Sequence, residues 1–161
     1  MPSFGLRSTE RLHDLCPQLR ECAYDVIQIL DHSIIETARS KALQDRYVAI
    51  GASKVEWPKS KHNVTSKRPK ALALDVWPYV KPYGALSGNP IQIDKIARDT
   101  GRSKGEVKEF VYKAFARLAG AYELAGWQRG YTVRWGGDWD GDGNLIDQSF
   151  HDLPHIELVE E

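Results

Sequence analysis

Two histidines and one aspartate are the residues of this sequence that best fit a metal-dependent reaction. His62, Asp75 and His155 all fall at the edges of predicted strands. A catalytic zinc site uses three protein ligands and keeps a fourth position for water, and Zn²⁺ accepts imidazole nitrogen and carboxylate oxygen alike. Each residue also has an ordinary interpretation, because loop histidines are often surface residues and an aspartate that ends an apolar strand often caps a turn. Residue type alone leaves both interpretations open.

A carboxylate stands three residues before the last of these histidines, in Asp152-Leu153-Pro154-His155. A general base must reach a water molecule by a hydrogen bond, but it need not bind the metal itself. A residue that leads into a ligand-bearing strand is well placed for that task. The alternative is a turn aspartate ahead of Pro154.

Four short motifs follow one another between residues 60 and 157. They are Ser60-Lys61-His62, Ala73-Leu74-Asp75, the run Trp135-Gly136-Gly137-Asp138-Trp139, and Asp152-x-x-His155-x-Glu157. Their order resembles the signature of the zinc D-alanyl-D-alanine carboxypeptidase and L-alanyl-D-glutamate endopeptidase family, and most of all its endolysins from tailed phages. The resemblance implies that His62, Asp75 and His155 bind zinc and that Asp152 is the catalytic acid and base.

Further roles follow from the same resemblance. Arg39 matches a basic residue that faces the substrate carbonyl or carboxylate, and Ser60 is expected to contact the substrate. The implied reaction is hydrolysis of a peptide bond in the stem peptide of bacterial peptidoglycan. The L-alanyl-D-glutamate bond is the favoured target, and a D-alanyl-D-alanine carboxypeptidase or dipeptidase is the alternative.

The implied biological role is that of a bacteriolytic phage endolysin. We expect residues 1–161 to form one zinc peptidase domain without a separate wall-binding module, and we expect a monomer. The N-terminal residues lack the apolar core of a signal peptide. An endolysin without one would stay in the host cytoplasm until lysis and then act on the wall.

Two features depart from the family pattern. Residues 63–74 lie between His62 and Asp75, a longer stretch than is usual in the family, and Ala71 stands where the family has glycine. An insertion at 63–70 that forms a surface loop would absorb both changes without moving the ligands. It would alter the substrate groove rather than the metal site.

A second group of acidic residues follows a calcium-loop pattern. Asp138, Asp140 and Asp142 occupy positions 1, 3 and 5, a glycine is sixth, and Asn144 is seventh. The twelfth position is Ser149 rather than the glutamate that would bind calcium through both oxygens. The alternative is an Asp/Gly turn between two strands.

Composition excludes several other classes of protein. The 161 residues suffice for one domain, and 42% hydrophobic with 27% charged residues is typical of a globular chain. Lys plus Arg equals Asp plus Glu, at 22 each, which argues against a nucleic-acid binder. No apolar run approaches the ~18 residues of a membrane span, so we expect no stable membrane association. Cys16 and Cys22 are expected to be unpaired.

The elements that must position these residues mix helices and strands without a regular rhythm. Helical spacing of apolar residues predicts helices after Pro17, over 41–50, and from a capping box at Ser103 to Gly126. Strands are expected at 33–38, 71–76, 131–135 and 155–159, and a long loop at 51–70. This pattern predicts an α+β domain with a small antiparallel sheet, flanking helices and a zinc site at the sheet edge.

One segment favours a different class of function. Residues 93–107 resemble a helix-turn-helix, with a short helix, a Thr-Gly turn and a longer helix. However, an apolar stripe occupies the second helix, and the net charge of the chain is zero. A DNA-binding protein is therefore the distant alternative.

Overall fold

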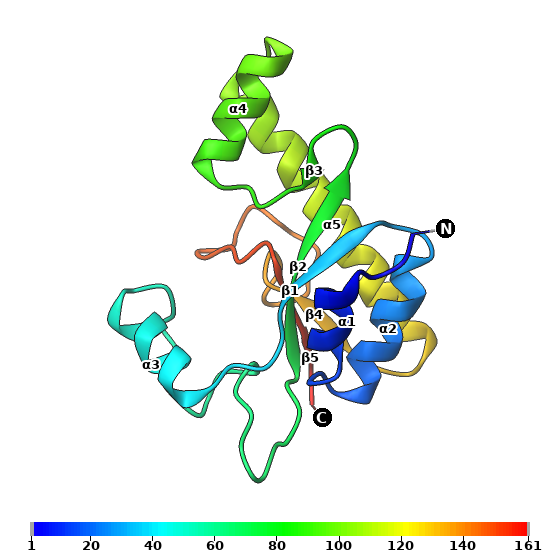
Figure 1. Ribbon diagram of the computed structural model, residues 1–161, viewed down its shortest axis with the longest axis vertical. Helices are drawn as coiled ribbons and strands as arrows, with labels where there is room; N and C mark the ends of the chain where they lie inside the picture. The colour runs from blue at the N-terminus through cyan, green and yellow to red at the C-terminus, as the bar shows by residue number, and fades with distance from the viewer. Residues whose placement is uncertain (1, 161) are drawn as a thin grey trace.

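Five helices and five strands make up residues 2–160, the part of the chain that this computed structural model describes (Figure 1). The helices are α1 (Leu6–Leu12), α2 (Pro17–Ile27), α3 (Lys41–Ala49), α4 (Pro90–Thr100) and α5 (Lys104–Gln128). The strands are β1 (His32–Glu36), β2 (Ala73–Val80), β3 (Gly84–Ala85), β4 (Val133–Trp135) and β5 (His155–Leu158). The predicted α+β class is confirmed.

The strands form one antiparallel sheet in the order β1-β2-β5-β4, and β3 pairs with the far end of β2. Asp75 lies opposite His155 across β2 and β5, and the neighbouring pair is Leu74 with Ile156. Successive side chains of a strand point to opposite faces. The register therefore gives the sheet one polar face, which carries Asp75 and His155, and one apolar face.

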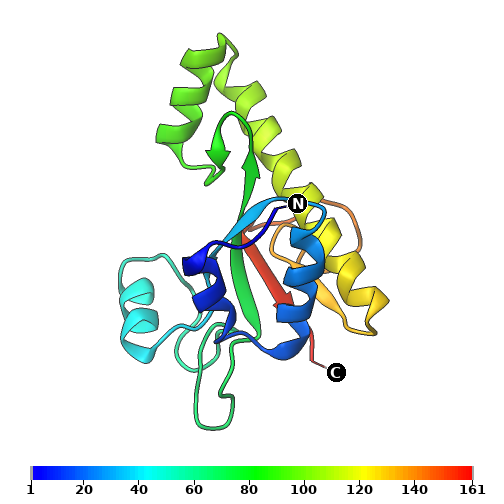
Figure 2. The same ribbon diagram turned by 45° about the vertical axis from the view of Figure 1, so that its right-hand side comes forward.

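The apolar face forms the core of the protein. Leu74, Ile156 and Ile34 are fully buried there, and α2 and α5 pack side by side against this face. Figure 1 shows α3 on the other side of the sheet, where the polar face lies. Figure 2 shows α4, the first half of α5 and the β2–β3 hairpin extending beyond the rest of the molecule.

A bulge in β1 shapes the polar face. Ile34 pairs with Val76, whereas Glu36 pairs with Asp75, so Ile35 is the extra residue. Bulges redirect side chains and are common beside active sites. Here the bulge brings Glu36 onto the same face as Asp75.

The longest helix begins as predicted and ends later than predicted. Both bonds of the Ser103–Glu106 capping box are present. Gly126 does not end the helix, which continues to Gln128, and Gly130 takes the positive φ of 76°. A Cβ at Gly126 would come within 2.5 Å of the Val133 side chain. The glycine therefore permits close packing of α5 on β4 instead of terminating the helix.

The other predicted boundaries hold within a few residues, with two elements added. No helix or strand interrupts 51–70, which is the expected long loop. The strands β1 and β4 are shorter than predicted, and α1 and β3 were not predicted. The segment at 93–107 does contain two helices around Gly101, whose φ is 69°, but Val107 and Val111 of the second helix are buried.

Two smaller expectations concern cysteines and membranes. Cys16 and Cys22 are both buried and unpaired, as predicted. Among residues 2–160, no helix has the length and apolar character that crossing a membrane requires.

His32 makes the stability of the fold depend on pH. Burial lowers the pKa of this histidine to about 4, against 6.5 for an ordinary histidine. Its Nδ1 donates to the Leu30 carbonyl and its Nε2 accepts from the buried Tyr122 hydroxyl, both at 2.8 Å. The folded state resists protonation while the unfolded state accepts it, so stability is lost as pH falls from 6.5 towards 4.

We expect the free energy of unfolding of the metal-free protein to fall by about 2 kcal/mol between pH 7 and pH 5 because of His32 alone. Urea unfolding at both pH values gives the change in the free energy of unfolding for the wild type and for His32→Asn. The difference between these two changes is the contribution of His32. Equal pH dependences would show that His32 does not contribute.

Candidate active site

The three predicted metal ligands come together on the polar face of the sheet. His62 lies in the loop between α3 and β2, Asp75 lies in β2, and His155 begins β5. His62 Nε2 and His155 Nδ1 are 3.2 Å apart. Asp75 Oδ1 lies 3.3 Å from the former nitrogen and 3.4 Å from the latter. One donor atom from each residue thus occupies a corner of a nearly equilateral triangle.

This triangle fits a tetrahedral metal ion. Donors at 2.0–2.1 Å from Zn²⁺ are about 3.3–3.4 Å apart, since a tetrahedron's edge is about 1.63 times its centre-to-corner distance. Within residues 2–160, Asp75 Oδ1 is buried and receives no hydrogen bond. Burial tends to raise the pKa of Asp75, but the adjacent His62 and His155 outweigh it and hold this pKa well below its usual range. A buried, unpartnered carboxylate oxygen facing two imidazole nitrogens is suited to a cation.

Each imidazole is held so that one nitrogen faces the centre of the triangle. The Nδ1 of His62 donates to the Thr37 carbonyl at 2.8 Å, which leaves Nε2 free. The Nε2 of His155 lies 2.9 Å from Glu157 Oε2, which leaves Nδ1 free. Such outer partners fix the tautomer and orientation of metal-binding histidines.

Glu157 is itself anchored and keeps its charge. It is buried and also receives hydrogen bonds from Arg134. Burial on its own raises its pKa, but His155 and Arg134 lower it to about 2. Burial likewise opposes the charged form of His155, but Asp75 and Glu157 raise the pKa of this histidine to about 9.

Asp152 lies beside the same centre. Its carbonyl accepts from the backbone N–H of His155 at 3.0 Å, so the two residues share one tight turn before β5. Burial raises the pKa of Asp152, and the negative charge of Asp75 adds to this effect. A carboxyl with a raised pKa, held beside these three candidate metal ligands, is suited to accept a proton and release it again.

Arg39 and Ser60 both lie near His62. The Arg39 guanidinium is buried, bonds Glu36, donates to Gln44 Oε1 at 3.1 Å, and reaches within 3.9 Å of Asp75 Oδ2. Ser60 Oγ accepts from the His62 backbone N–H at 3.3 Å. The structure therefore places Ser60 as a support for the His62 turn, and its contact with substrate stays a prediction.

A cavity of about 500 Å³ is lined by Arg39, Ser60, His62, Asp152, His155 and Glu157. One wall is aromatic, because the rings of Trp139 and Phe150 stack with centroids 6.4 Å apart. The loop between α3 and β2 also contributes to the lining, through residues 51–55 and 59–62. The cavity is large enough for several residues of a peptide, and His155 and Asp152 are among the residues that such a peptide would meet.

Comparisons with known proteins show similarity to peptidases, in sequence and in fold. The chain is 25% identical over 161 residues to the L-alanyl-D-glutamate peptidase of Escherichia phage T5, covering 97% of both chains. The chain is a homologue of this peptidase. Its fold matches the crystal structure of the Serratia marcescens L-Ala D-Glu endopeptidase ChiX with a TM-score of 0.64 and 24% identity, over 97% of this chain and 89% of that one. No family model matches the sequence.

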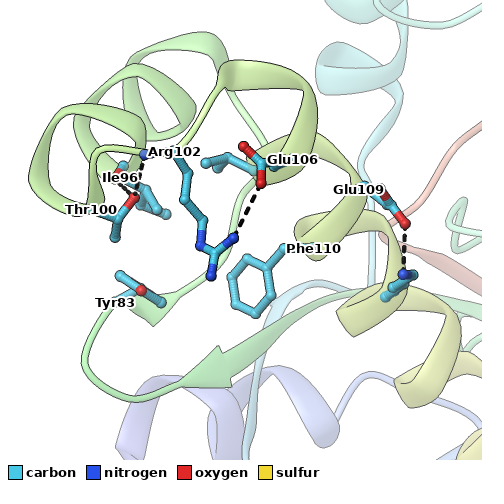
Figure 3. Close-up of a pocket in the computed structure, with 9 residues that line it drawn as sticks. Tyr83, Ile96, Thr100, Arg102, Glu106, Glu109 and Phe110 are labelled. Carbon is cyan, nitrogen blue, oxygen red and sulfur yellow. Dashed lines mark hydrogen bonds and ion pairs between the residues drawn. The ribbon is translucent and has the colours of Figure 1, made fainter.

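A second cavity, of about 440 Å³, lies between the β2–β3 hairpin and the helices α4 and α5 (Figure 3). Its charged residues pair with one another, since Arg102 contacts Glu106 at 3.1 Å and Lys113 contacts Glu109 at 2.6 Å. Tyr83 and Phe110 pack edge to face inside it. The cavity brings together no metal-binding group among the described residues, so the chemistry is assigned to the first cavity.

The predicted calcium loop is compact and acidic. Asp138, Asp140 and Asp142 each place a carboxylate oxygen within 4.8 Å of the others. Both oxygens of Asp138 also accept backbone N–H groups, from Gly141 and Gly143 at 3.0 Å. The same geometry serves an Asp/Gly turn, so calcium binding by this loop, including Asn144, stays a prediction.

Three supporting residues have no role in the sequence interpretation. Glu157 is part of a quoted motif, and its position two residues after His155 in a strand is the signal that could have identified it. Thr37 acts through its carbonyl, which any residue carries. Gln44 is fully buried in α3 and links Arg39 to Asn63, and only the three-dimensional contacts reveal it.

Proposed function

We propose that this protein is a zinc-dependent endopeptidase that hydrolyses the L-alanyl-D-glutamate bond of bacterial peptidoglycan, in the manner of a phage endolysin. The observation that carries the proposal is the triangle of His62, Asp75 and His155, two of which line the same cavity as Asp152. The full-length similarity to a phage L-alanyl-D-glutamate peptidase supports the choice of bond. We further propose that the domain acts as a monomer on the host wall after lysis begins.

The residues of the site divide the work of the reaction. Bound zinc would supply Lewis acidity, which lowers the pKa of water from 15.7 to about 7. Asp152 would take the proton of the attacking water and deliver it to the leaving amine nitrogen. Arg39 lies beside Asp75 and would stabilise negative charge that develops on the carbonyl oxygen, a contribution of about 3–4 kcal/mol for such a donor.

Digestion of purified sacculi tests the proposal. The released peptides should carry a new glutamate N-terminus by mass spectrometry, and activity should vanish with a zinc chelator and return with added Zn²⁺. Release of D-alanine instead would identify a D-alanyl-D-alanine carboxypeptidase of the same family. If neither product forms, the proposed function is wrong.

Glu157 gives a prediction about metal affinity. Glu157→Gln removes the charge that orients His155, so we expect zinc affinity to fall by about 10- to 100-fold. Competition with a chromogenic chelator measures this affinity directly. Glu160→Gln is the matched control, because Glu160 is an exposed carboxylate that pairs with Lys61 at 2.7 Å. Equal affinities in the two variants would show that Glu157 does not support the metal.

A further inference from the structure

We propose that Lys54 and Lys59, at the rim of the active-site cavity, bind the free carboxylate of the glutamate residue next to the scissile bond. The inference rests on the proposed function and adds the group that the site recognises. It assigns a specific role to two residues of a basic stretch between α3 and β2, which comprises Lys54, Lys59, Lys61, Lys67, Arg68 and Lys70.

The substrate itself demands such a cation. Cleavage of an alanyl-glutamate bond makes glutamate the leaving residue. Glutamate has two carboxyl groups and the peptide continues through only one of them. The other stays a free carboxylate, two or four covalent bonds from the scissile nitrogen. It must therefore enter the same cavity as the bond that is cut, where an unpaired negative charge would be costly.

Five cationic residues line the cavity, and three of them already have carboxylate partners. Arg39 pairs with Glu36, Arg134 with the buried Glu157, and Lys61 with Glu160. Among residues 2–160, Lys54 and Lys59 form no ion pair. The ammonium groups of these two lysines are therefore available to pair with a carboxylate of a ligand.

Lys54 is directed across the cavity rather than away from it. Its Nζ lies 5.6 Å from the centroid of the Phe150 ring, which belongs to the aromatic wall of the same cavity. A cation over an aromatic face at this range is attracted to it. The Lys54 side chain therefore reaches from the loop at 51–62 to the loop that precedes β5, and both of these loops line the cavity.

The backbone on both sides of each lysine is fixed by a polar side chain. The buried Gln44 donates through Nε2 to Ser53 Oγ at 3.0 Å and to the Val55 carbonyl, which flank Lys54. Arg68 donates to the carbonyls of Pro58 and Ser60 at 3.0 and 2.6 Å, which flank Lys59. A carboxylate ligand would meet two lysines on preorganised turns, which reduces the entropy lost on binding.

Arg68 also gives the insertion at 63–70 a structural task. Its Nε donates to the Asn63 carbonyl at 3.0 Å, so the guanidinium spans from the insertion to the turn that carries Lys59. The additional residues between His62 and Asp75 thus hold in place the turn that carries Lys59 at the rim of the cavity.

Paired substrates test the proposal. One is a short peptide with an L-alanyl-D-glutamate bond and a free glutamate carboxylate. The other is the same peptide with that carboxyl group converted to a primary amide. We expect the wild type to prefer the acid at least about tenfold in kcat/KM. Lys54→Met with Lys59→Met should lower kcat/KM for the acid by about 10- to 100-fold and leave the amide within about twofold.

Methionine keeps the apolar length of the lysine stem, so the variants remove charge with little loss of packing. Lys67→Met is the matched control, because Lys67 belongs to the same basic stretch, is exposed, and does not line the cavity. Zinc content and the melting temperature are measured alongside, and both should match the wild type.

The possible outcomes separate the two proposals. If the wild type cleaves neither peptide, the proposed function fails. If the wild type cleaves both peptides equally well, the lysines do not bind the carboxylate and the proposed function stands. The same conclusion follows if the double variant lowers kcat/KM by the same factor for both peptides. Loss of the preference for the acid in the double variant alone supports the inference.

Discussion

Asp152→Asn should keep its zinc and its fold and lose about 10²- to 10⁴-fold in kcat/KM. The amide is isosteric with the carboxylate, so the turn to His155 remains, with its hydrogen bond of 3.0 Å to the Asp152 carbonyl. The substitution removes the carboxylate that we propose as the proton acceptor for the attacking water. The other nearby carboxylates already have partners or another place. Asp75 points towards His62 and His155, Glu157 is engaged by His155 and Arg134, and Glu36 is engaged by Arg39 and Tyr47.

Steady-state hydrolysis of the peptide, with zinc content measured on the same samples, checks this expectation. Asp99→Asn is the control, since Asp99 is an exposed aspartate of α4 that pairs with Lys95 far from the cavity. Full activity in Asp152→Asn would remove Asp152 from the mechanism. Loss of zinc together with activity would show instead that Asp152 holds the metal site together.

The shared face of Asp75 and His155 follows from strand alternation, although the choice of His62, Asp75 and His155 as metal ligands came from the family resemblance. Asp75 stands in a strand whose neighbours Leu74 and Val76 are apolar, and His155 precedes Ile156 in the same way. Once the two strands pair in antiparallel register, the two polar residues must share a face. His62 required the family resemblance, since a loop residue has no periodicity from which its position can be derived.

The supporting contacts could not be predicted, because they depend on distant backbone atoms. The Thr37 carbonyl that orients His62 is 25 residues away in sequence, and the Gln44 network joins a helix to two loops. At Gly126, a local rule gave a prediction that tertiary packing overrides. A glycine near a helix end usually terminates the helix, but here the need for close packing against Val133 decides its position. Local rules predicted the helix α5, but they could not show that Gly126 serves packing rather than helix termination.

Gly136 is the residue on which the positions of Asp152 and His155 jointly depend. Its N–H donates to the His155 carbonyl at 2.8 Å, and its carbonyl accepts from the Asp152 N–H at 2.7 Å. A Cβ at this position would lie 2.4 Å from the Asp152 carbonyl oxygen and 3.0 Å from the Cβ of His155. The clash involves backbone that is already hydrogen-bonded, so a side chain cannot relieve it by rotating.

Gly136→Ala should therefore separate the end of β4 from the turn that carries Asp152 and His155. We expect about 1–3 kcal/mol of lost stability from the overpacking. Because a shift of about 1 Å can cost about 10²-fold in rate, kcat/KM should fall by at least that factor. Thermal unfolding and peptide hydrolysis measure the two effects separately.

Gly120→Ala is the matched control for this substitution. Gly120 is exposed in α5, and a Cβ there would meet nothing within 4 Å. Alanine at such a helix position is favoured over glycine by about 1 kcal/mol, so this variant should be more stable than the wild type and equally active. If Gly136→Ala behaved like Gly120→Ala, the β4 end would be free to move, and the close backbone contact would not be what positions Asp152 and His155.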